Sequence, residues 1–308
     1  MSSVTATAQT ISPARDESFS TLVALMPTFL AFSWLVSKAQ WYWNHRPDMQ
    51  FGWIVLMLCG FVIWDQWAKR PAPTWRLHPL FVLGGLSGLG ILFVMQLYQA
   101  AFGLMPAVMM GLTVGAYAVA AANIHYVYGW AGLRFYAFPL FFFLIALPLP
   151  SFIYAPLVNG LQQKIATANV EILNLIGIPA HRSGSLIELP NGTVGINEAC
   201  SGIRSLQSTI MATLFIGYLT LKRRFLQITL LLSGVFFAIA GNLVRSLYLS
   251  LTANARGLAA VEKVHDSAGW TILLFTALSV ALTAWLFSLL EKRVAREEAR
   301  LQPGSAPS

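Results

Sequence analysis

The sequence is dominated by apolar runs that match the thickness of a bilayer, whose hydrocarbon core takes about 20 helical residues to cross. Only 10% of the residues are charged and the mean hydropathy is +0.64, whereas a soluble domain carries roughly 25% charged residues. The runs are 19–37, 51–67, 79–102, 106–123, 132–150, 203–221, 225–250 and 268–290. We therefore predict an all-α polytopic membrane protein with about eight transmembrane helices.

The basic residues indicate orientation. The net charge is +8, but the lysines and arginines form short clusters between apolar runs rather than one basic face, which argues against a nucleic-acid partner. The turn Lys222-Arg223-Arg224 and the basic C-terminal tail favour cytoplasmic termini, because positive loops stay inside. This orientation places Cys200, Arg245 and His265 on the extracytoplasmic side.

The chain divides into a tail at each end and one membrane domain between them. We expect a mobile N-terminal tail at 1–18, one transmembrane domain at 19–290 and a basic cytoplasmic tail at 291–308. The longest segment that spans nothing is 151–199. Its first half alternates apolar and polar residues as an amphipathic interfacial helix does. Its second half predicts a β-hairpin, with strands at 185–189 and 193–196 around an Asn-Gly turn, forming one wall of a cleft.

A polar stretch with one cysteine follows the hairpin. It reads Asn197-Glu198-Ala199-Cys200-Ser201-Gly202-Ile203-Arg204-Ser205. A thiolate is favoured at a helix N-terminus and beside a cation. If the next helix starts between Glu198 and Ser201, its unpaired N–H groups surround the sulfur, Gly202 permits close approach to them, and Arg204 shares the face of Cys200. Alternatively, Cys200 is a small buried residue and Arg204 an arginine at the headgroups.

Two further residues can assist a thiol. Arg245 lies inside an apolar helix, where a charge costs at least about 2.5 kcal/mol, and Asn242 shares its face at i−3. His265 can accept a proton from the thiol and return it to a leaving group. We expect His265 to precede the last helix directly, with Asp266 or Ser267 as the N-cap. The alternatives are a snorkelling arginine and a solvated histidine.

The sequence contains no motif for metal binding or for phosphate binding. No His, Cys or Glu set has the spacing of metal ligands, and there is no phosphate-binding glycine loop, so no cofactor is expected. Cys59 lies midway along an apolar run and is interpreted as an ordinary core residue. From the residues alone, the candidate is an outward-facing thiol that transfers an acyl group. Two alternatives remain, a non-enzymatic component of transport or polysaccharide export and a membrane O-acyltransferase.

Three sequence blocks together carry a resemblance. Asn-Glu-Ala-Cys200-Ser-Gly-Ile-Arg204-Ser, Gly-Asn-Leu-Val-Arg245 and His265-Asp-Ser-Ala-Gly-Trp270 resemble, in order, the exosortase/archaeosortase family of prokaryotic membrane proteins. The likeness covers roughly 20–290. It implies a membrane-embedded cysteine protease or transpeptidase whose catalytic residues are Cys200, Arg245 and His265.

The resemblance also implies the partners. Such enzymes act in the cell envelope on secreted proteins with a C-terminal sorting signal of the PEP-CTERM type, made of a Pro-containing motif, a transmembrane helix and a basic tail. The protein would lie in the prokaryotic inner membrane with its active site outside. A thioacyl intermediate would pass to a cell-surface acceptor, a polysaccharide or lipid, or to water. The motif, the acceptor and the oligomeric state are open.

Overall fold

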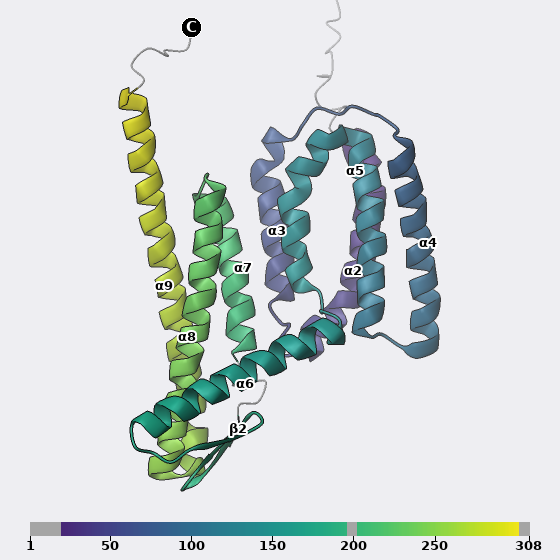
Figure 1. Ribbon diagram of the computed structural model, residues 1–308. Coiled ribbons are helices and arrows are strands. Elements are labelled where there is room, and N and C mark those ends of the chain that lie inside the picture. The colour runs from purple at the N-terminus through teal and green to yellow at the C-terminus, as the bar shows by residue number, and fades with distance from the viewer. Residues whose placement is uncertain (1–19, 196–201, 302–308) are drawn as a thin grey trace, which may run out of the picture. The chain divides into compact units, whose positions relative to one another are not determined.

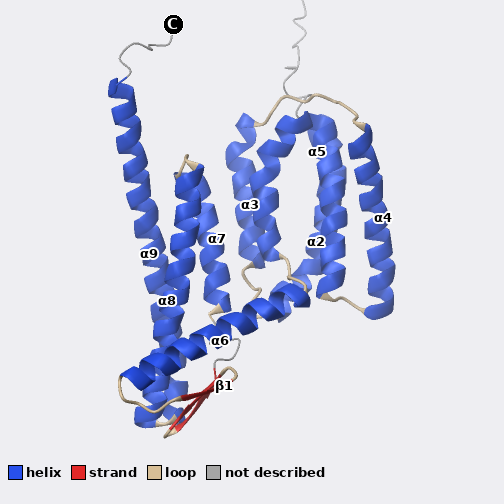
Figure 2. Ribbon diagram, in the orientation of Figure 1, coloured by secondary structure: helices blue, strands red, loops and turns tan. Residues whose placement is uncertain are grey.

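The computed structural model describes residues 20–195 and 202–301 (Figure 1). Contacts divide the chain into two compact units, one up to Pro150 and one from Ser151 onward. The described part is helical apart from a small three-stranded sheet, drawn red in Figure 2. The fold is thus an all-α membrane protein with a small sheet.

The described part of the first unit contains four long helices. They are α2 (Met26–His45), α3 (Gly52–Gln66), α4 (Pro79–Phe102) and α5 (Pro106–Phe143), with short 3₁₀ turns η1 (Trp67–Lys69) and η2 (Leu144–Ala146). Proline occupies the first turn of α2, α4 and α5, where its missing N–H costs nothing. In the core, the indole of Trp43 donates to the carbonyl of Ala146 at 2.7 Å. Gly52 permits this packing, because a Cβ there would overlap the Trp43 ring.

Helix α5 reverses direction at Gly129, whose φ of 63° and ψ of −154° are not helical. The Tyr117 hydroxyl donates to the Leu140 carbonyl at 2.6 Å. A continuous helix would separate these two residues by about 35 Å, so the two halves of α5 are antiparallel neighbours, as Figure 1 shows. The break lies between the predicted runs 106–123 and 132–150.

The second unit begins with α6 (Ser151–Leu175) and the sheet. Helix α6 is the predicted amphipathic helix, but two of its polar residues, Gln162 and Asn169, lie on its buried face. Strands β2 (Leu186–Leu189) and β3 (Gly192–Gly195) form the predicted hairpin. Its turn is centred on Pro190 and Asn191, one residue earlier than expected, because Gly192 already pairs with Leu189. A third strand, β1 (His181–Ser183), was not predicted and pairs with β2.

Three helices complete this unit: α7 (Ile203–Thr220), α8 (Arg224–Arg256) and α9 (Leu258–Leu301). Helix α6, the hairpin, α8 and α9 share one core, centred on Ile165, Leu173, Ile187 and Leu249. The side chain of Asn191 in the hairpin turn also donates to the carbonyl of Asn254 in α8 at 2.6 Å. The hairpin is therefore fixed to α8.

The last helix starts earlier than predicted. Gly257, with φ of 77°, ends α8, and α9 begins at the next residue. Val261, Val264 and Ala268 pack on the core of the unit, which favours a helix through this region. His265 is therefore inside α9, and the expected N-cap at Asp266 or Ser267 is wrong. At its other end α9 runs into the predicted tail, where Glu291 accepts the backbone N–H groups of Lys222 and Arg223.

Within the described ranges, four helices are long and apolar enough to cross a membrane. They are Pro79–Phe102, Pro106–Ala146, Arg224–Arg256 and Leu258–Glu298. The second contains the reversal at Gly129. Helices α2, α3 and α7 correspond to the other predicted runs but do not reach this length and hydropathy. Eight spans, and cytoplasmic termini, stay predictions.

Candidate active site

The candidate site is built on the contact between α8 and α9. Arg245 lies in α8 and is partly buried, and its Nη2 lies 3.1 Å from Nε2 of His265 in α9. The same Nη2 donates to the backbone carbonyl of His265 at 3.4 Å. An arginine inside an apolar helix therefore has a defined polar neighbour, and that neighbour is the other residue predicted to assist the thiol.

The Arg245 contact selects a state of the His265 ring. Arginine donates hydrogen bonds and accepts none, so Nε2 accepts only when it carries no proton. The other ring nitrogen, Nδ1, lies 3.1 Å from Oδ1 of Asp266 and donates to it. A ring with its proton on Nδ1 and a lone pair on Nε2 would satisfy both contacts. The Asp266 side chain is 93% exposed, so its pull on the ring is screened by water.

A second contact connects this site to the cysteine segment. Gly202 has φ of 77° and precedes the first residue of α7. A Cβ at this position would lie 2.5 Å from Cγ of Asn242, which is 3% exposed and stands one turn before Arg245 on α8. Gly202 is therefore needed twice, for its left-handed backbone and for the close approach of Asn242.

The guanidinium of Arg245 lies beside a glycine of α9. A Cβ on Gly269, one turn after His265, would stand 3.4 Å from Nη2 of Arg245, which is ordinary contact distance. Alanine fits there, but a longer side chain would occupy the volume of the guanidinium. The spacing His265-x-x-x-Gly269 thus places the imidazole and the gap for its partner on the same face of one helix.

A buried polar pair supports the site from α6 and was missed by sequence reasoning. Nδ2 of Asn169 donates to Oγ of Ser246 at 2.6 Å, and both residues are at most 3% exposed. Ser246 follows Arg245 directly and lies one turn after Asn242. The available signal was the polar face of α8, where residues 242, 246, 250 and 254 recur every four positions.

The remaining predicted residues are distributed as follows. Cys200, Glu198 and Ser201 lie outside the described residues. Arg204 is in the first turn of α7 and exposed. Helix α7 begins at Ile203, after the left-handed Gly202, whereas we expected its start between Glu198 and Ser201. The predicted placement of Cys200 on the same helix face as Arg204 lies outside the described residues. Cys59 is 7% exposed in α3, as expected of a core residue.

A comparison with protein families agrees with this arrangement. The profile of the transmembrane exosortases (Exosortase_EpsH) matches residues 43–293, which contain every residue discussed above. The chain belongs to the transmembrane exosortase family. No curated protein and no solved structure matches it.

Membership of the exosortase family agrees with the apolar helices of the structure. The apolar helices make it a multi-pass membrane protein, and the family indicates a transpeptidase-like role in the membrane. Within residues 20–195 and 202–301, no group of three His, Cys, Asp or Glu side chains could hold a metal ion.

Proposed function

We propose that this exosortase is a cysteine transpeptidase that cleaves the C-terminal sorting signal of secreted proteins, with Cys200 as nucleophile and Arg245 and His265 as its partners. The observation that carries the proposal is the 3.1 Å contact between Arg245 and His265, together with Asn242 packed on Gly202. Because Gly202 follows Cys200 by two residues, we infer that the thiol is delivered to the same cluster. The site faces the outside of the inner membrane, as the basic turn Lys222-Arg223-Arg224 suggests.

The first half-reaction forms a thioester. His265 takes the proton of the Cys200 thiol, and the thiolate attacks the carbonyl carbon at the scissile bond. The carbonyl electrons move to oxygen, and the guanidinium of Arg245 stabilises this oxyanion. When the oxyanion collapses, the C–N bond breaks, and the leaving amine, which carries the signal's transmembrane helix, takes the proton from His265.

The contact between Arg245 and His265 suggests how these two residues act together. The lone pair on Nε2 of His265 now accepts from Arg245. Once this nitrogen takes the thiol proton, two donors face each other, and the guanidinium must leave. Proton transfer from the thiol therefore releases Arg245 at the moment when the oxyanion forms. Gly269 gives the guanidinium room to move, since no side chain stands beside it there.

The second half-reaction resolves the thioester. An amine or hydroxyl of a cell-surface acceptor, or water, attacks the thioester carbonyl while His265 removes its proton. The C–S bond breaks and the thiolate takes the proton back from His265. A polysaccharide or lipid acceptor gives transfer, and water gives hydrolysis.

The test is gel mobility of a co-expressed secreted protein that ends in Pro-Glu-Pro, a transmembrane helix and a basic tail. Wild type removes the tail, whereas Cys200→Ala and Cys200→Ser leave it in place, because neither offers a thiolate. Cys59→Ala is the matched control, since Cys59 is a buried cysteine of α3, and it retains cleavage. Cleavage by Cys200→Ala, or its absence in wild type for every Pro-containing signal encoded beside this chain, contradicts the proposal.

A further inference from the structure

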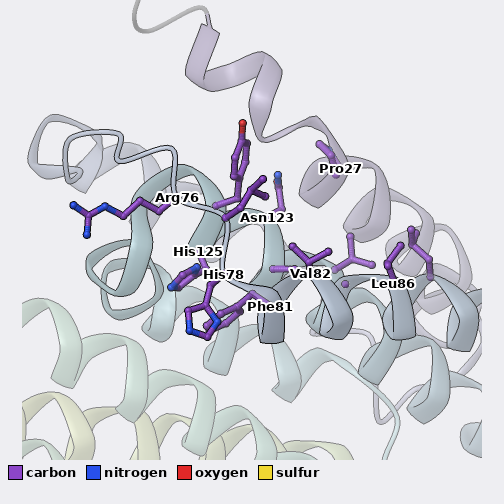
Figure 3. Close-up of a pocket in the computed structure, with 14 residues that line it drawn as sticks. Pro27, Arg76, His78, Phe81, Val82, Leu86, Asn123 and His125 are labelled. Carbon is purple, nitrogen blue, oxygen red and sulfur yellow. The ribbon is translucent and has the colours of Figure 1, made fainter.

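A pocket in the first unit lies away from the residues proposed for catalysis. It has a volume of about 240 Å³ and is bordered by the start of α2, the segment before α4, and helices α4 and α5. Figure 3 shows Arg76, His78 and His125 at one end, and Val82 and Leu86 farther along. Nothing in the transpeptidase reaction uses these residues.

The part of the pocket that follows α4 is apolar. Phe81, Val82, Gly85, Leu86 and Leu89 line it, at the spacing of one helix face. From Phe81 to Leu89 the helix rises about 12 Å, and α4 is one of the helices able to span a membrane. The apolar part therefore runs from the start of the span into the hydrocarbon layer, and its apolar lining suits an acyl chain.

The other end of the pocket is lined by Arg76, whose backbone is held in place. Arg76 is exposed, and its guanidinium makes no hydrogen bond or ion pair with any described residue. Its backbone N–H donates to the Tyr126 carbonyl at 3.0 Å, and the N–H of Thr74 donates to the Val127 carbonyl at 2.7 Å. These carbonyls lie just before the break at Gly129, so the segment before α4 is held against the reversal of α5.

The connection between α3 and α4 is wholly basic in charge. Residues 67–78 contain Lys69, Arg70 and Arg76 and no acidic residue. Basic pockets between transmembrane helices, at the cytoplasmic ends of the spans, bind the headgroups of anionic lipids. The positive charge at the mouth therefore selects an occupant with a negative headgroup.

A buried histidine supplies a second polar group. His125 is 5% exposed and lines the pocket, and its ring stacks on Phe81 with centroids 3.9 Å apart. Its Nδ1 is buried and has no hydrogen-bond partner among the described residues. Buried polar atoms rarely stay unpaired, because their desolvation is then uncompensated. A headgroup oxygen at the mouth would satisfy this nitrogen.

From these observations we propose that the α2/α4/α5 pocket binds one anionic phospholipid. One acyl chain lies along Val82, Leu86 and Leu89, and the phosphate lies beside Arg76. The site belongs to the first unit and does not depend on the transpeptidase proposal.

The experiment is native mass spectrometry of the full chain in micelles that contain equal amounts of phosphatidylglycerol and phosphatidylcholine. Wild type retains one phosphatidylglycerol about fivefold more often than phosphatidylcholine, the ratio expected for one basic residue near an anionic headgroup. Arg76→Gln brings the ratio to about one. Val82→Trp fills the pocket and lowers retention of both lipids.

Two control variants separate the pocket from the general lipid surface. Arg134→Gln removes an exposed charge outside the pocket, and Leu83→Trp adds the same bulk on the outer face of α4, where Leu83 is 62% exposed. Both behave as wild type. The proposal is overturned if wild type shows no preference, if the controls lose lipid as the pocket variants do, or if lipid binds only after deletion of residues 2–19, which would make the N-terminal segment the occupant.

Discussion

Two histidine-bearing regions of this molecule differ in how their polar atoms are paired. His265 has a donor on one ring nitrogen and an acceptor on the other, and its side chain is 31% exposed. His125 is stacked on Phe81, 5% exposed, and its Nδ1 has no partner in the described parts of the chain. The two contacts of the first ring suit a tautomer with a lone pair on Nε2, which acid–base catalysis can use. The second is held by aromatic contacts, which suit a binding pocket.

The largest difference in cleavage between the two regions is expected when each histidine is replaced by glutamine. His265→Gln is expected to lower signal cleavage by about 10²–10⁴-fold, the usual contribution of a general acid–base group. His125→Gln is the matched control in the other region and leaves cleavage within about threefold. Initial rates on the co-expressed reporter measure both. Equal losses in the two variants would show that the effect comes from folding rather than proton transfer.

The role of Arg245 is tested by charge and by shape. Arg245→Gln removes the cation and is expected to cost about 10²–10³-fold in cleavage, as loss of an oxyanion donor does. Arg245→Lys keeps the charge but presents a point cation on a flexible stem, so it recovers part of the rate. The matched change in the other region, Arg76→Gln, leaves the cleavage rate unchanged. A lysine variant no better than glutamine would argue against charge stabilisation.

Two glycines with the same positive φ test the contact beside the cysteine segment. Gly202 and Gly257 both have φ of 77°, but a Cβ meets Asn242 at 2.5 Å only in the first, while open space surrounds the second. Alanine costs roughly 1–2 kcal/mol at Gly202, whose ψ of 3° is left-handed helical. It is at least as strained at Gly257, whose ψ of 174° lies in a region that is essentially restricted to glycine. Gly202→Ala also displaces Asn242, so it lowers cleavage tenfold or more, whereas Gly257→Ala lowers only the melting temperature. Equal cleavage in both variants would remove Gly202 from the site.

The smallest expected effect concerns the pair that fixes α8. Asn169→Ala leaves Ser246 buried without its donor, at a cost of about 1–3 kcal/mol. Thermal unfolding of the purified chain detects this loss, and cleavage falls only a fewfold because Asn169 touches no reacting atom. Gln163→Ala, on the exposed face of α6, stays within about 0.5 kcal/mol of wild type. If Ser246→Ala adds its full cost to Asn169→Ala, the two side chains are not coupled.

The two regions also differ in how far the sequence predicts them. Arg245 and Asn242 could be found because charged and amide side chains inside apolar helices are costly and therefore informative. His265 could be found because a histidine can exchange a proton with a thiol. The start of α9 was misjudged, since the polar residues around His265 resemble a cap, whereas Val261 and Val264 pack on a core made of distant segments. The burial of Asn169 could not be predicted for the same reason, because its partner Ser246 lies 77 residues away.

The pocket could not be predicted at all. Its walls come from residues near Pro27, from Arg76 to Leu89 and from Val119 to Tyr126, and each of these segments is ordinary by itself. It depends on the reversal at Gly129, where a positive φ frees the carbonyls that hold the segment before α4. Glycine is common in such helices, so its presence did not indicate the turn.

The central claim is that Cys200 forms a thioester within reach of Arg245 and His265. Intact mass spectrometry of the enzyme, denatured in acid during turnover of the sorting-signal reporter, tests it most directly. The account predicts an adduct equal in mass to the reporter without its C-terminal helix, located on Cys200, removed by hydroxylamine and lost in Cys200→Ala. An adduct on Cys59, or turnover of the reporter with no hydroxylamine-sensitive adduct even when His265→Gln slows the reaction, would contradict it.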